Sequence, residues 1–369
     1  MPDFLPFWFF PVACALLGAC IGSFLNVVIY RVPRGVSINS PARSFCPGCK
    51  SSIPWSQNIP VFSWLHLRGK CRSCGMKIPV RYWLVEIITA LLFGAIAWAN
   101  AYQPPLSIAL MCLWCAIAIA IAWIDAEHML VFPSLTIIGA AFGILRELSG
   151  FSILEEIETN WFEALFFSLF GVVFGYLLIR GIIILGRILF GKWKREYPEA
   201  VSWELIEPEG DMGEMLLRLP DGDYAWSDMF SRPEDTARLQ QATVIIDGNK
   251  QEEGNWTLMP ENLVSPSGER IPLNKIKSAR GTVLQVEGCR EAMGGGDAWI
   301  MMMIGAIAGW QGVLFSLFIG ALFGIITGIA SKRGWGTPIP FGPSLLAAAV
   351  IWLLGGHALW EAYMIWVIG

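Results

Sequence analysis

Long apolar stretches, separated by polar segments, dominate this chain of 369 residues. About 20 consecutive apolar residues are enough for a helix to cross the hydrocarbon core of a bilayer. Eight stretches are candidates, and they lie near residues 5–30, 82–99, 106–124, 131–148, 162–190, 298–311, 312–330 and 343–367. The pattern therefore predicts an all-α polytopic membrane protein with about eight spans, or seven if the short run at 298–311 joins its neighbour.

Composition agrees with a membrane protein. Hydrophobic residues make up 55% of the chain, charged residues make up only 15%, and 18 residues are Trp. This balance excludes an ordinary soluble domain. We therefore expect membrane lipid around the helices, and we expect no nucleic-acid partner.

Basic residues gather in one segment between the first two stretches. Residues 31–81 hold nine Lys and Arg residues and no acid. Because short cytoplasmic loops of membrane proteins are enriched in Lys and Arg, this segment should be cytoplasmic. With eight spans, both termini then lie outside. Asp125 at the end of the third span and Asp297 at the start of the sixth should both lie at the cytoplasmic face.

These two aspartates stand at the ends of apolar runs. Asp297 follows Gly294, Gly295 and Gly296. An ionisable group next to hydrocarbon costs roughly 3 kcal/mol on insertion scales, so it usually has a function. Two carboxyl groups that share a proton can activate water and polarise a carbonyl group. We therefore expect Asp125 and Asp297 to form the catalytic pair of an aspartic protease.

The glycines before Asp297 fit that interpretation. Gly294 and Gly296 would form a supporting loop, in which the backbone can approach a substrate closely or adopt positive φ. The alternative at each aspartate is a helix-end acid without a catalytic role. The helix macrodipole would favour Asp297 at a helix N-terminus in either case.

Four cysteines in the basic segment have the spacing of a metal site. Two C-x2-C pairs, Cys46 with Cys49 and Cys71 with Cys74, have 21 residues between them. This spacing is typical of a closed, structural zinc site with four thiolate ligands. Disulfides are the alternative, but a reducing cytoplasmic loop disfavours them.

A polar, acid-rich segment interrupts the apolar pattern at residues 192–290. Strand and turn signals recur within it, at 216–222, 243–248 and 282–286. We expect a small β-rich cytoplasmic domain here, inserted between spans. The chain then divides into a first span at 1–31, a cysteine-rich loop at 32–81, four spans at 82–191, the insert at 192–290 and the last spans at 291–369.

Five groups of residues, in order, resemble the motifs of bacterial prepilin peptidases of type IV pilus and type II secretion systems. They are Gly22 to Pro33; Arg43 to Glu86, with the four cysteines; Asp125 with Met129, Leu130 and Pro133; Arg290 to Asp297, of the form GxGD; and Ile339 to Pro343. The likeness covers the chain except for roughly residues 192–280. The sequence departs from the family pattern at Ser134, where an acid is common, and at Trp299, where Lys is usual.

The resemblance implies a bifunctional enzyme of the bacterial inner membrane with its active site facing the cytoplasm. Such enzymes cut the leader peptide of prepilins and pseudopilins after a glycine. They then methylate the new N-terminal amine, with S-adenosylmethionine as donor. Asp125 and Asp297 match the family's catalytic aspartates, and the four cysteines mark its methylating members. Glu86 belongs to the pattern, and we expect it in the methylation or substrate region.

Two other functions stay open at this point. A peptidase with the same aspartate pair can cleave without methylating. A zinc-bearing membrane scaffold of the pilus or secretion machinery can lack catalysis altogether. The scaffold accounts for the cysteines but leaves the two aspartates unexplained.

Overall fold

The computed structural model describes residues 6–40, 44–46, 48–54, 57–149, 161–189, 192–206, 215–230, 235–289, 293–330 and 339–368. Of the motif residues named above, Arg43 and Arg290 lie outside these ranges. The chain forms two compact units. The first consists of Met1–Ile179, Gly296–Ser331 and Pro340–Gly369, and the second of Arg180–Gly295 and Lys332–Ile339.

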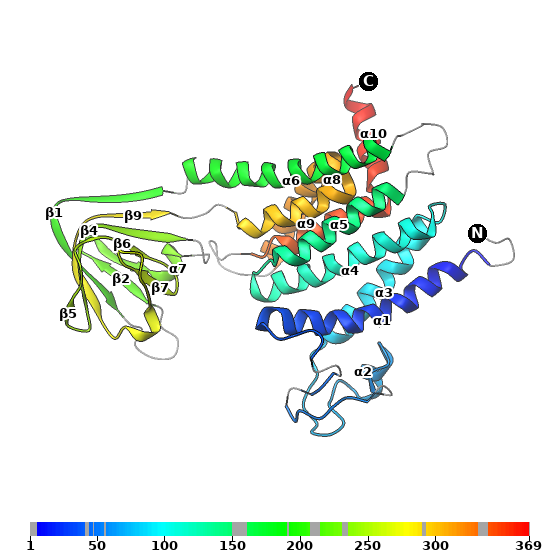
Figure 1. The fold of residues 1–369 in the computed structure, drawn as a ribbon, viewed down its shortest axis with the longest axis horizontal. Helices are drawn as coiled ribbons and strands as arrows, with labels where there is room; N and C mark the ends of the chain where they lie inside the picture. Colours follow the sequence, from blue (N-terminus) through cyan, green and yellow to red (C-terminus); the bar gives the residue numbers. More distant parts are fainter. Residues whose placement is uncertain are drawn as a thin grey trace. The chain divides into compact units, whose positions relative to one another are not determined.

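The first unit is a bundle of helices with a cysteine-rich loop at one end (Figure 1). Its helices in the described ranges are α1 (Phe9–Arg31), α2 (Phe62–His66), α3 (Arg81–Ala99), α4 (Pro105–His128), α5 (Pro133–Ser149), α6 (Trp161–Leu189, whose residues after Ile179 fall in the second unit), α8 (Gly295–Ala330), α9 (Gly342–Ile351) and α10 (His357–Ile368). A π-turn at Trp352–Gly356 joins α9 to α10. The short helix α2 belongs to the loop that connects α1 to α3.

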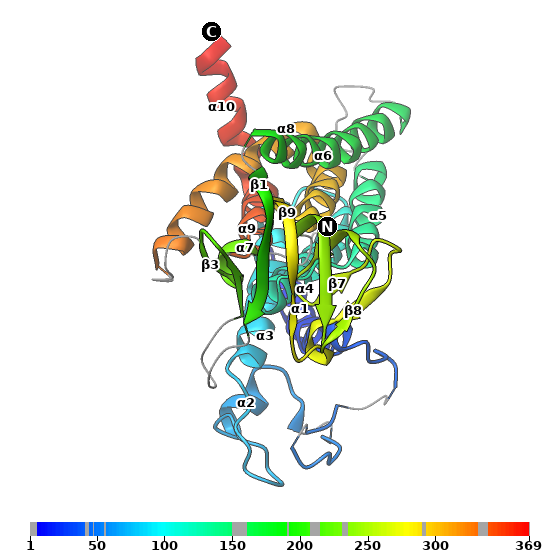
Figure 2. The same ribbon diagram turned by 90° about the vertical axis from the view of Figure 1, so that its left-hand side faces the viewer.

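Each of the eight predicted apolar stretches falls on helix. Within the described part of the chain, six helices are long and apolar enough to cross a membrane. The number of such helices is lower than the eight predicted spans for two reasons. Helix α5 has only 17 residues, and the runs at 298–311 and 312–330 form one helix, α8, which breaks at Gly309 (φ 63°, ψ −171°). Figure 2 shows the two parts of α8 running in different directions. The structure thus supports a polytopic helical unit, and the count of eight spans stays a prediction.

Glycines allow the backbones of α6 and α8 to touch. A Cβ atom on Gly171 would lie 2.2 Å from the carbonyl oxygen of Gly305, and one on Gly305 would lie 2.0 Å from that of Gly171. Gly175, one turn along α6, faces Met301 in the same way. Small residues four apart are the usual means of close helix packing in membranes. The Ser168 hydroxyl adds a hydrogen bond to the carbonyl oxygen of Ala306 at 2.6 Å.

The second unit contains one antiparallel sheet in the order β3-β2-β1-β9-β4-β6-β7-β8, with β5 beside β4. The strands are β1 (Lys192–Ile206), β2 (Leu216–Leu219), β3 (Gly222–Ala225), β4 (Thr236–Ile246), β5 (Asn249–Lys250), β6 (Gly254–Leu258), β7 (Asn262–Val264), β8 (Arg270–Pro272) and β9 (Ala279–Cys289). A short helix, α7 (Trp226–Met229), follows β3. The predicted strand signals at 216–219, 243–246 and 282–286 are confirmed, because they fall on β2, β4 and β9.

Alternation along the strands builds the core of this unit. Successive side chains of a strand point to opposite faces, and β4 buries alternate residues on each side of a bulge between Leu239 and Ala242. Leu239 before the bulge and Val244 after it belong to one buried cluster with Trp203 and Trp256. The turn from β4 to β5 has positive φ at both Asp247 and Gly248, as a two-residue hairpin requires. The first and last strands pair with each other over most of their length.

Candidate active site and metal centre

Asp125 lies in the last turn of α4 and is buried, with 6% of its surface exposed. The helix ends directly afterwards, where Met129 takes a left-handed conformation and its N–H donates to the carbonyl oxygen of Asp125 at 2.8 Å. The Asp125 carboxylate accepts a hydrogen bond from the backbone N–H of Gly342 at 3.0 Å. Gly342 is the first residue of α9, so the carboxylate satisfies one of the N–H groups that a helix start leaves unpaired.

Asp297 lies in the first turn of α8 and is also buried, with 8% exposed. An acid in the first turn of a helix is stabilised by the macrodipole. Helix α8 begins at Gly295, so Gly296 is helical and does not belong to a loop, while Gly294 directly precedes the helix. Gly296 has no positive φ. The backbone at Gly296 packs closely against Val131, because a Cβ atom on Gly296 would lie 2.7 Å from Cγ2 of Val131.

Two sets of contacts link the C-terminal end of α4 to the N-terminal end of α8. Val131, which touches Gly296, follows Asp125 by six residues. A Cβ atom on Gly342 would lie 2.6 Å from the Asp125 Oδ2 atom and 2.7 Å from Cδ1 of Ile300. Ile300 is three residues after Asp297 and therefore on the same side of α8. The Asp125 end of α4 thus adjoins the Asp297 end of α8.

Two tryptophans pack the neighbouring helices against the start of α8. Trp299 stands where Lys is usual, and its ring meets the edge of Tyr176 from α6 at a centroid distance of 5.4 Å. Deeper in the bundle, the Trp114 indole N–H donates to the carbonyl oxygen of Met303 at 3.3 Å. These contacts hold α4 and α6 against the first part of α8, which carries Asp297.

The four loop cysteines form one cluster. Their sulfur atoms all lie within 4.8 Å of one another, and Cys46 Sγ is 3.8 Å from Cys74 Sγ. All four are free thiols. Four thiolates at about 2.3 Å from a tetrahedral ion would be roughly 3.8 Å apart, so the cluster fits a closed metal site.

Each pair of cysteines is shaped by a small hairpin. The bridge from Phe45 to Ser52 encloses the first pair, and the bridge from Lys70 to Lys77 encloses the second. The Ser51 side chain and backbone hydrogen-bond the Cys49 sulfur, and they lower the pKa of Cys49 to about 6. A lower pKa favours the thiolate, which is the form that binds metal.

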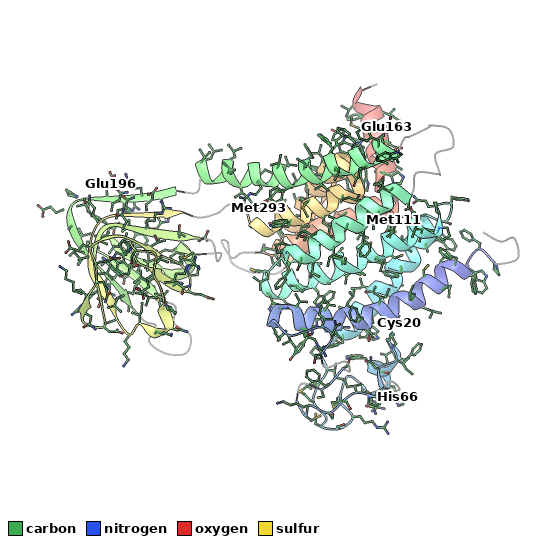
Figure 3. The ribbon with its side chains drawn as sticks, in the orientation of Figure 1. Cys20, His66, Met111, Glu163, Glu196 and Met293 are labelled. Atoms are coloured by element: carbon green, nitrogen blue, oxygen red, sulfur yellow. The ribbon has the colours of Figure 1, made fainter. Side chains whose placement is uncertain are left out.

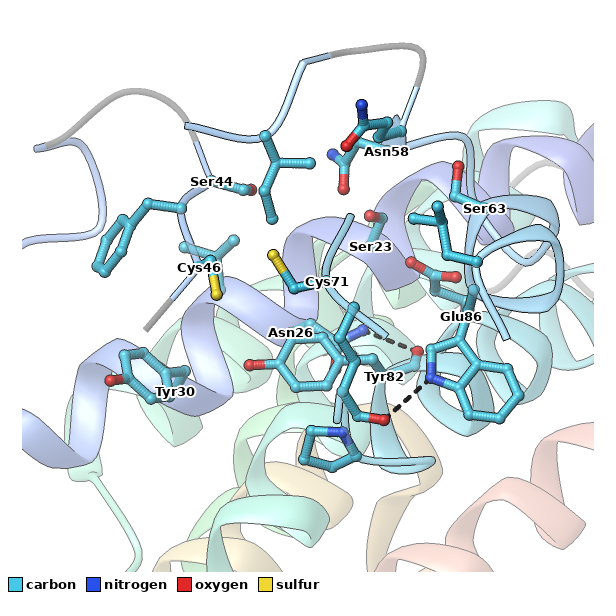
Figure 4. Close-up of a pocket in the computed structure, with 18 of the residues that line it drawn as sticks. Ser23, Asn26, Tyr30, Ser44, Cys46, Asn58, Ser63, Cys71, Tyr82 and Glu86 are labelled. Carbon is cyan, nitrogen blue, oxygen red and sulfur yellow. Dashed lines mark hydrogen bonds between the residues drawn. The ribbon is translucent and has the colours of Figure 1, made fainter. Parts of the chain in front are cut away.

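A cavity of 170 Å³ lies between this loop and the adjoining ends of α1 and α3. Figure 4 shows its labelled lining residues: Ser23, Asn26 and Tyr30 from α1, Tyr82 and Glu86 from α3, and Ser44, Cys46, Asn58, Ser63 and Cys71 from the loop. The Asn26 amide donates to the carbonyl oxygen of Tyr82 at 3.0 Å and ties α1 to α3. The Glu86 carboxylate accepts the N–H of Val61 at 2.7 Å.

The sequence did not predict this cavity. Its lining residues are spread from Ser23 to Glu86, and only folding brings them together. A signal was nevertheless present, because Ser23, Asn26 and Glu86 are polar residues within or next to predicted spans, where polar groups are costly.

The chain matches two families by sequence. Residues 16–100 match the Bacterial Peptidase A24 N-terminal domain. This region includes most of α1, the cysteine cluster and the whole lining of the cavity. Residues 283–329 match the Type IV leader peptidase family, which includes Asp297. No solved structure matches the chain.

Individual relatives are described as prepilin leader peptidase/N-methyltransferase. That of Pseudomonas aeruginosa is 27% identical, over 96% of this chain and 93% of its own. That of Klebsiella pneumoniae is 35% identical, over 48% of this chain and 75% of its own. That of Myxococcus xanthus is 45% identical over a shorter region, 37% of this chain and 39% of its own.

Proposed function

This chain belongs to the prepilin leader peptidase/N-methyltransferase family of enzymes, and we propose that it processes type IV prepilins and pseudopilins in two steps. It cuts the leader peptide after a glycine on the cytoplasmic side of the membrane. It then methylates the new N-terminal amine. The observation that carries the first step is the pair of buried acids, Asp125 and Asp297, on helix ends that meet at Gly342.

Cleavage needs only the two carboxyl groups and a water molecule. One carboxylate takes a proton from the water, whose oxygen attacks the carbonyl carbon of the scissile bond. The protonated partner hydrogen-bonds the carbonyl oxygen and then gives its proton to the leaving amine. Because the groups share a proton, their two apparent pKa values belong to the pair. Burial of both side chains strengthens these interactions by excluding water.

Methylation uses a separate set of groups. S-adenosylmethionine, when bound, supplies the methyl group. The cysteine cluster would hold zinc through Cys46, Cys49, Cys71 and Cys74, and four thiolates leave no open coordination position for a substrate. We therefore assign the zinc ion a structural function in the loop.

The proposed orientation follows from charge. Residues 31–81, from the end of α1 to the start of α3, hold nine Lys and Arg residues and no acid, which favours the cytoplasmic side. The enzyme would then lie in the bacterial inner membrane with the cysteine cluster and both aspartates facing the cytoplasm, and with both termini outside.

Mass spectrometry of a co-expressed prepilin tests both steps at once. We expect the leader to be lost, and the mature N-terminus to carry one added methyl group. An uncut prepilin would contradict the peptidase assignment. A cut pilin with a free amine would contradict the methyltransferase assignment and favour an enzyme that only cleaves.

A further inference from the structure

The short helix α2 carries large apolar side chains on the side that faces away from the cavity. Phe62 is 71% exposed and Leu65 is 50% exposed. The two residues are three apart, so they lie on one side of the helix and form its outer face. On the other side, Ser63 and Trp64 belong to the lining of the cavity. Large apolar side chains that are exposed side by side mark a surface that contacts another molecule or an apolar phase.

Helix α2 packs against the side of α3 rather than beyond its end. The Trp64 ring stacks on Trp83 at a centroid distance of 5.8 Å, and the N–H of Val61 donates to the Glu86 carboxylate at 2.7 Å. Trp83 and Glu86 are the third and sixth residues of α3, so these contacts lie roughly 3–8 Å along the helix from its start. Figure 1 shows α2 below α1, level with a part of that helix rather than beyond its end. The outer face is therefore held level with the first two turns of α3.

Lipid covers this part of α3 when the helix spans a bilayer. Helix α3 is long and apolar enough to cross a membrane. Trp83 is followed at intervals of four residues by Ile87 and Leu91, and residues four apart lie along one row of a helix. Leu91 is 66% exposed, so the row that begins beside α2 leads to a surface that faces lipid. Interfacial helices bury their apolar faces about 5–10 Å into the boundary between headgroups and acyl chains, which is similar to the distance of α2 from the start of α3.

Exposed basic side chains follow the outer face directly. His66 ends α2 (Figure 3), and Arg68 and Lys70 come within five residues of Leu65; all three are exposed. Residues 31–81 contain no acid. Lys and Arg near a membrane surface attract anionic headgroups, and their long apolar stems let the charge reach the headgroups from an apolar neighbourhood. An apolar face beside basic residues is typical of a membrane-surface anchor.

We propose that the outer face of α2 inserts into the leaflet beside α3 and that Arg68 and Lys70 bind the headgroups of anionic phospholipids there. The bilayer then holds the cysteine-rich loop against α3, in addition to the contacts that Trp64 and Val61 make with that helix. Anionic lipid is therefore a binding partner of the loop as well as the solvent of the helices. The inference goes beyond the proposed function and depends on neither cleavage nor methylation.

Photocrosslinking in the full-length protein tests where the outer face lies. The protein with p-benzoylphenylalanine in place of Phe62 is reconstituted into vesicles of phosphatidylglycerol and phosphatidylcholine and irradiated, and mass spectrometry identifies the adducts. We expect phospholipid adducts at position 62. The same probe in place of Leu91 is the positive control, and in place of Asn249, an exposed residue in a hairpin of the sheet unit, it is the negative control. An unchanged thermal midpoint shows that each protein is folded.

The lipid composition of the adducts tests the basic residues. From vesicles with equal amounts of the two lipids, the adducts should contain phosphatidylglycerol in about twofold excess or more, because each Lys or Arg near the surface favours anionic lipid. Arg68→Gln combined with Lys70→Gln should abolish that excess. Lys275→Gln combined with Lys277→Gln is the matched control, because it removes two exposed charges from the sheet unit and should leave the excess unchanged.

Three results would overturn the proposal. A folded protein in which the probe reacts with lipid at position 91 but not at position 62 would show that the outer face is not in the bilayer. An adduct to another protein chain in place of lipid would show that the face is a protein interface. An excess of phosphatidylglycerol that survives the changes at Arg68 and Lys70 would show that these two residues do not bind the headgroups.

Discussion

The carboxylate of Asp125 and the backbone N–H of Gly342 are joined by a hydrogen bond of 3.0 Å across 217 residues of sequence. The bond links the end of α4 to the start of α9 and holds the carboxylate beside Ile300 of α8. An asparagine at position 125 still has a side-chain oxygen that can accept it. Removal of the charge can therefore be separated from removal of the contact.

Asp125→Asn and Asp297→Asn should each reduce leader cleavage by at least about 10³-fold, because an amide can neither share the proton nor act as a base. The double variant should be no worse than either single one, since residues that act as one unit are non-additive. Cleavage of a co-purified prepilin, followed by mass spectrometry, measures this. Both variants should keep zinc and methylate a pilin that is supplied already cut. Near-normal cleavage by either folded variant would make that aspartate a helix-end residue.

Gly342→Ala tests whether the contact between Gly342 and the Asp125 carboxylate positions that carboxylate for catalysis. The new Cβ atom would lie 2.6 Å from the Asp125 Oδ2 atom and 2.7 Å from Ile300, so the carboxylate must shift. A displacement of about 1 Å in a catalytic group can cost roughly 10²-fold in rate, and we expect a loss of that order in cleavage. Gly181→Ala is the control, because nothing lies within 4 Å of its new Cβ atom. Equal activity of the two variants would show that Gly342 does not position Asp125.

The cysteine cluster should hold about one zinc ion per chain, and Cys71→Ser should release it and impair methylation more than cleavage. Metal analysis of the purified protein measures the content. A protein without zinc, in which all four thiols are freely alkylated, would contradict the site.

The pKa of Cys49 gives a separate pH test on metal-free protein. Because the hydrogen bonds of Ser51 lower that pKa to about 6, the thiolate is present above pH 6 and is lost as the pH falls through it. Alkylation of Cys49 by iodoacetamide should therefore be half-maximal near pH 6. Ser51→Ala should move the midpoint to higher pH, and the neighbouring Ser52→Ala should not. An identical midpoint in both variants would refute the assignment.

The sheet unit should be removable. Its first and last strands begin and end side by side, because Lys192 pairs with Cys289. Replacement of residues 192–289 by a short Gly/Ser bridge should therefore leave the helical unit able to fold, bind zinc and retain measurable cleavage. A deletion protein that inserts and binds zinc but cleaves nothing would show that the domain takes part in peptidase activity.

Sequence alone predicted the features that are local in the chain. The two cysteine pairs, the strand signals around Asp247 and the acids at the ends of apolar runs each depend on neighbouring residues. The division of the apolar runs at residues 311 and 312 lies close to the break at Gly309, but the sequence predicted two separate spans where the structure has one helix, α8. The contact of Asp125 with Gly342 and the lining of the cavity depend on residues far apart in sequence. A hydrophobicity pattern carries no information about such pairs.

The backbone contact between Gly171 and Gly305 has a consequence for how proteins of this architecture can diverge. It packs α6 and α8, the helices that precede and follow the sheet strands in sequence, against each other, and within the sheet Lys192 pairs with Cys289. The entropic cost of closing a longer loop rises by only about 0.6 kcal/mol for each doubling of its length. The chain segment between α6 and α8 can therefore become longer or shorter, or be replaced by another sequence, while the helices that carry the two aspartates keep their packing. Variation in size among related enzymes should concentrate at this point.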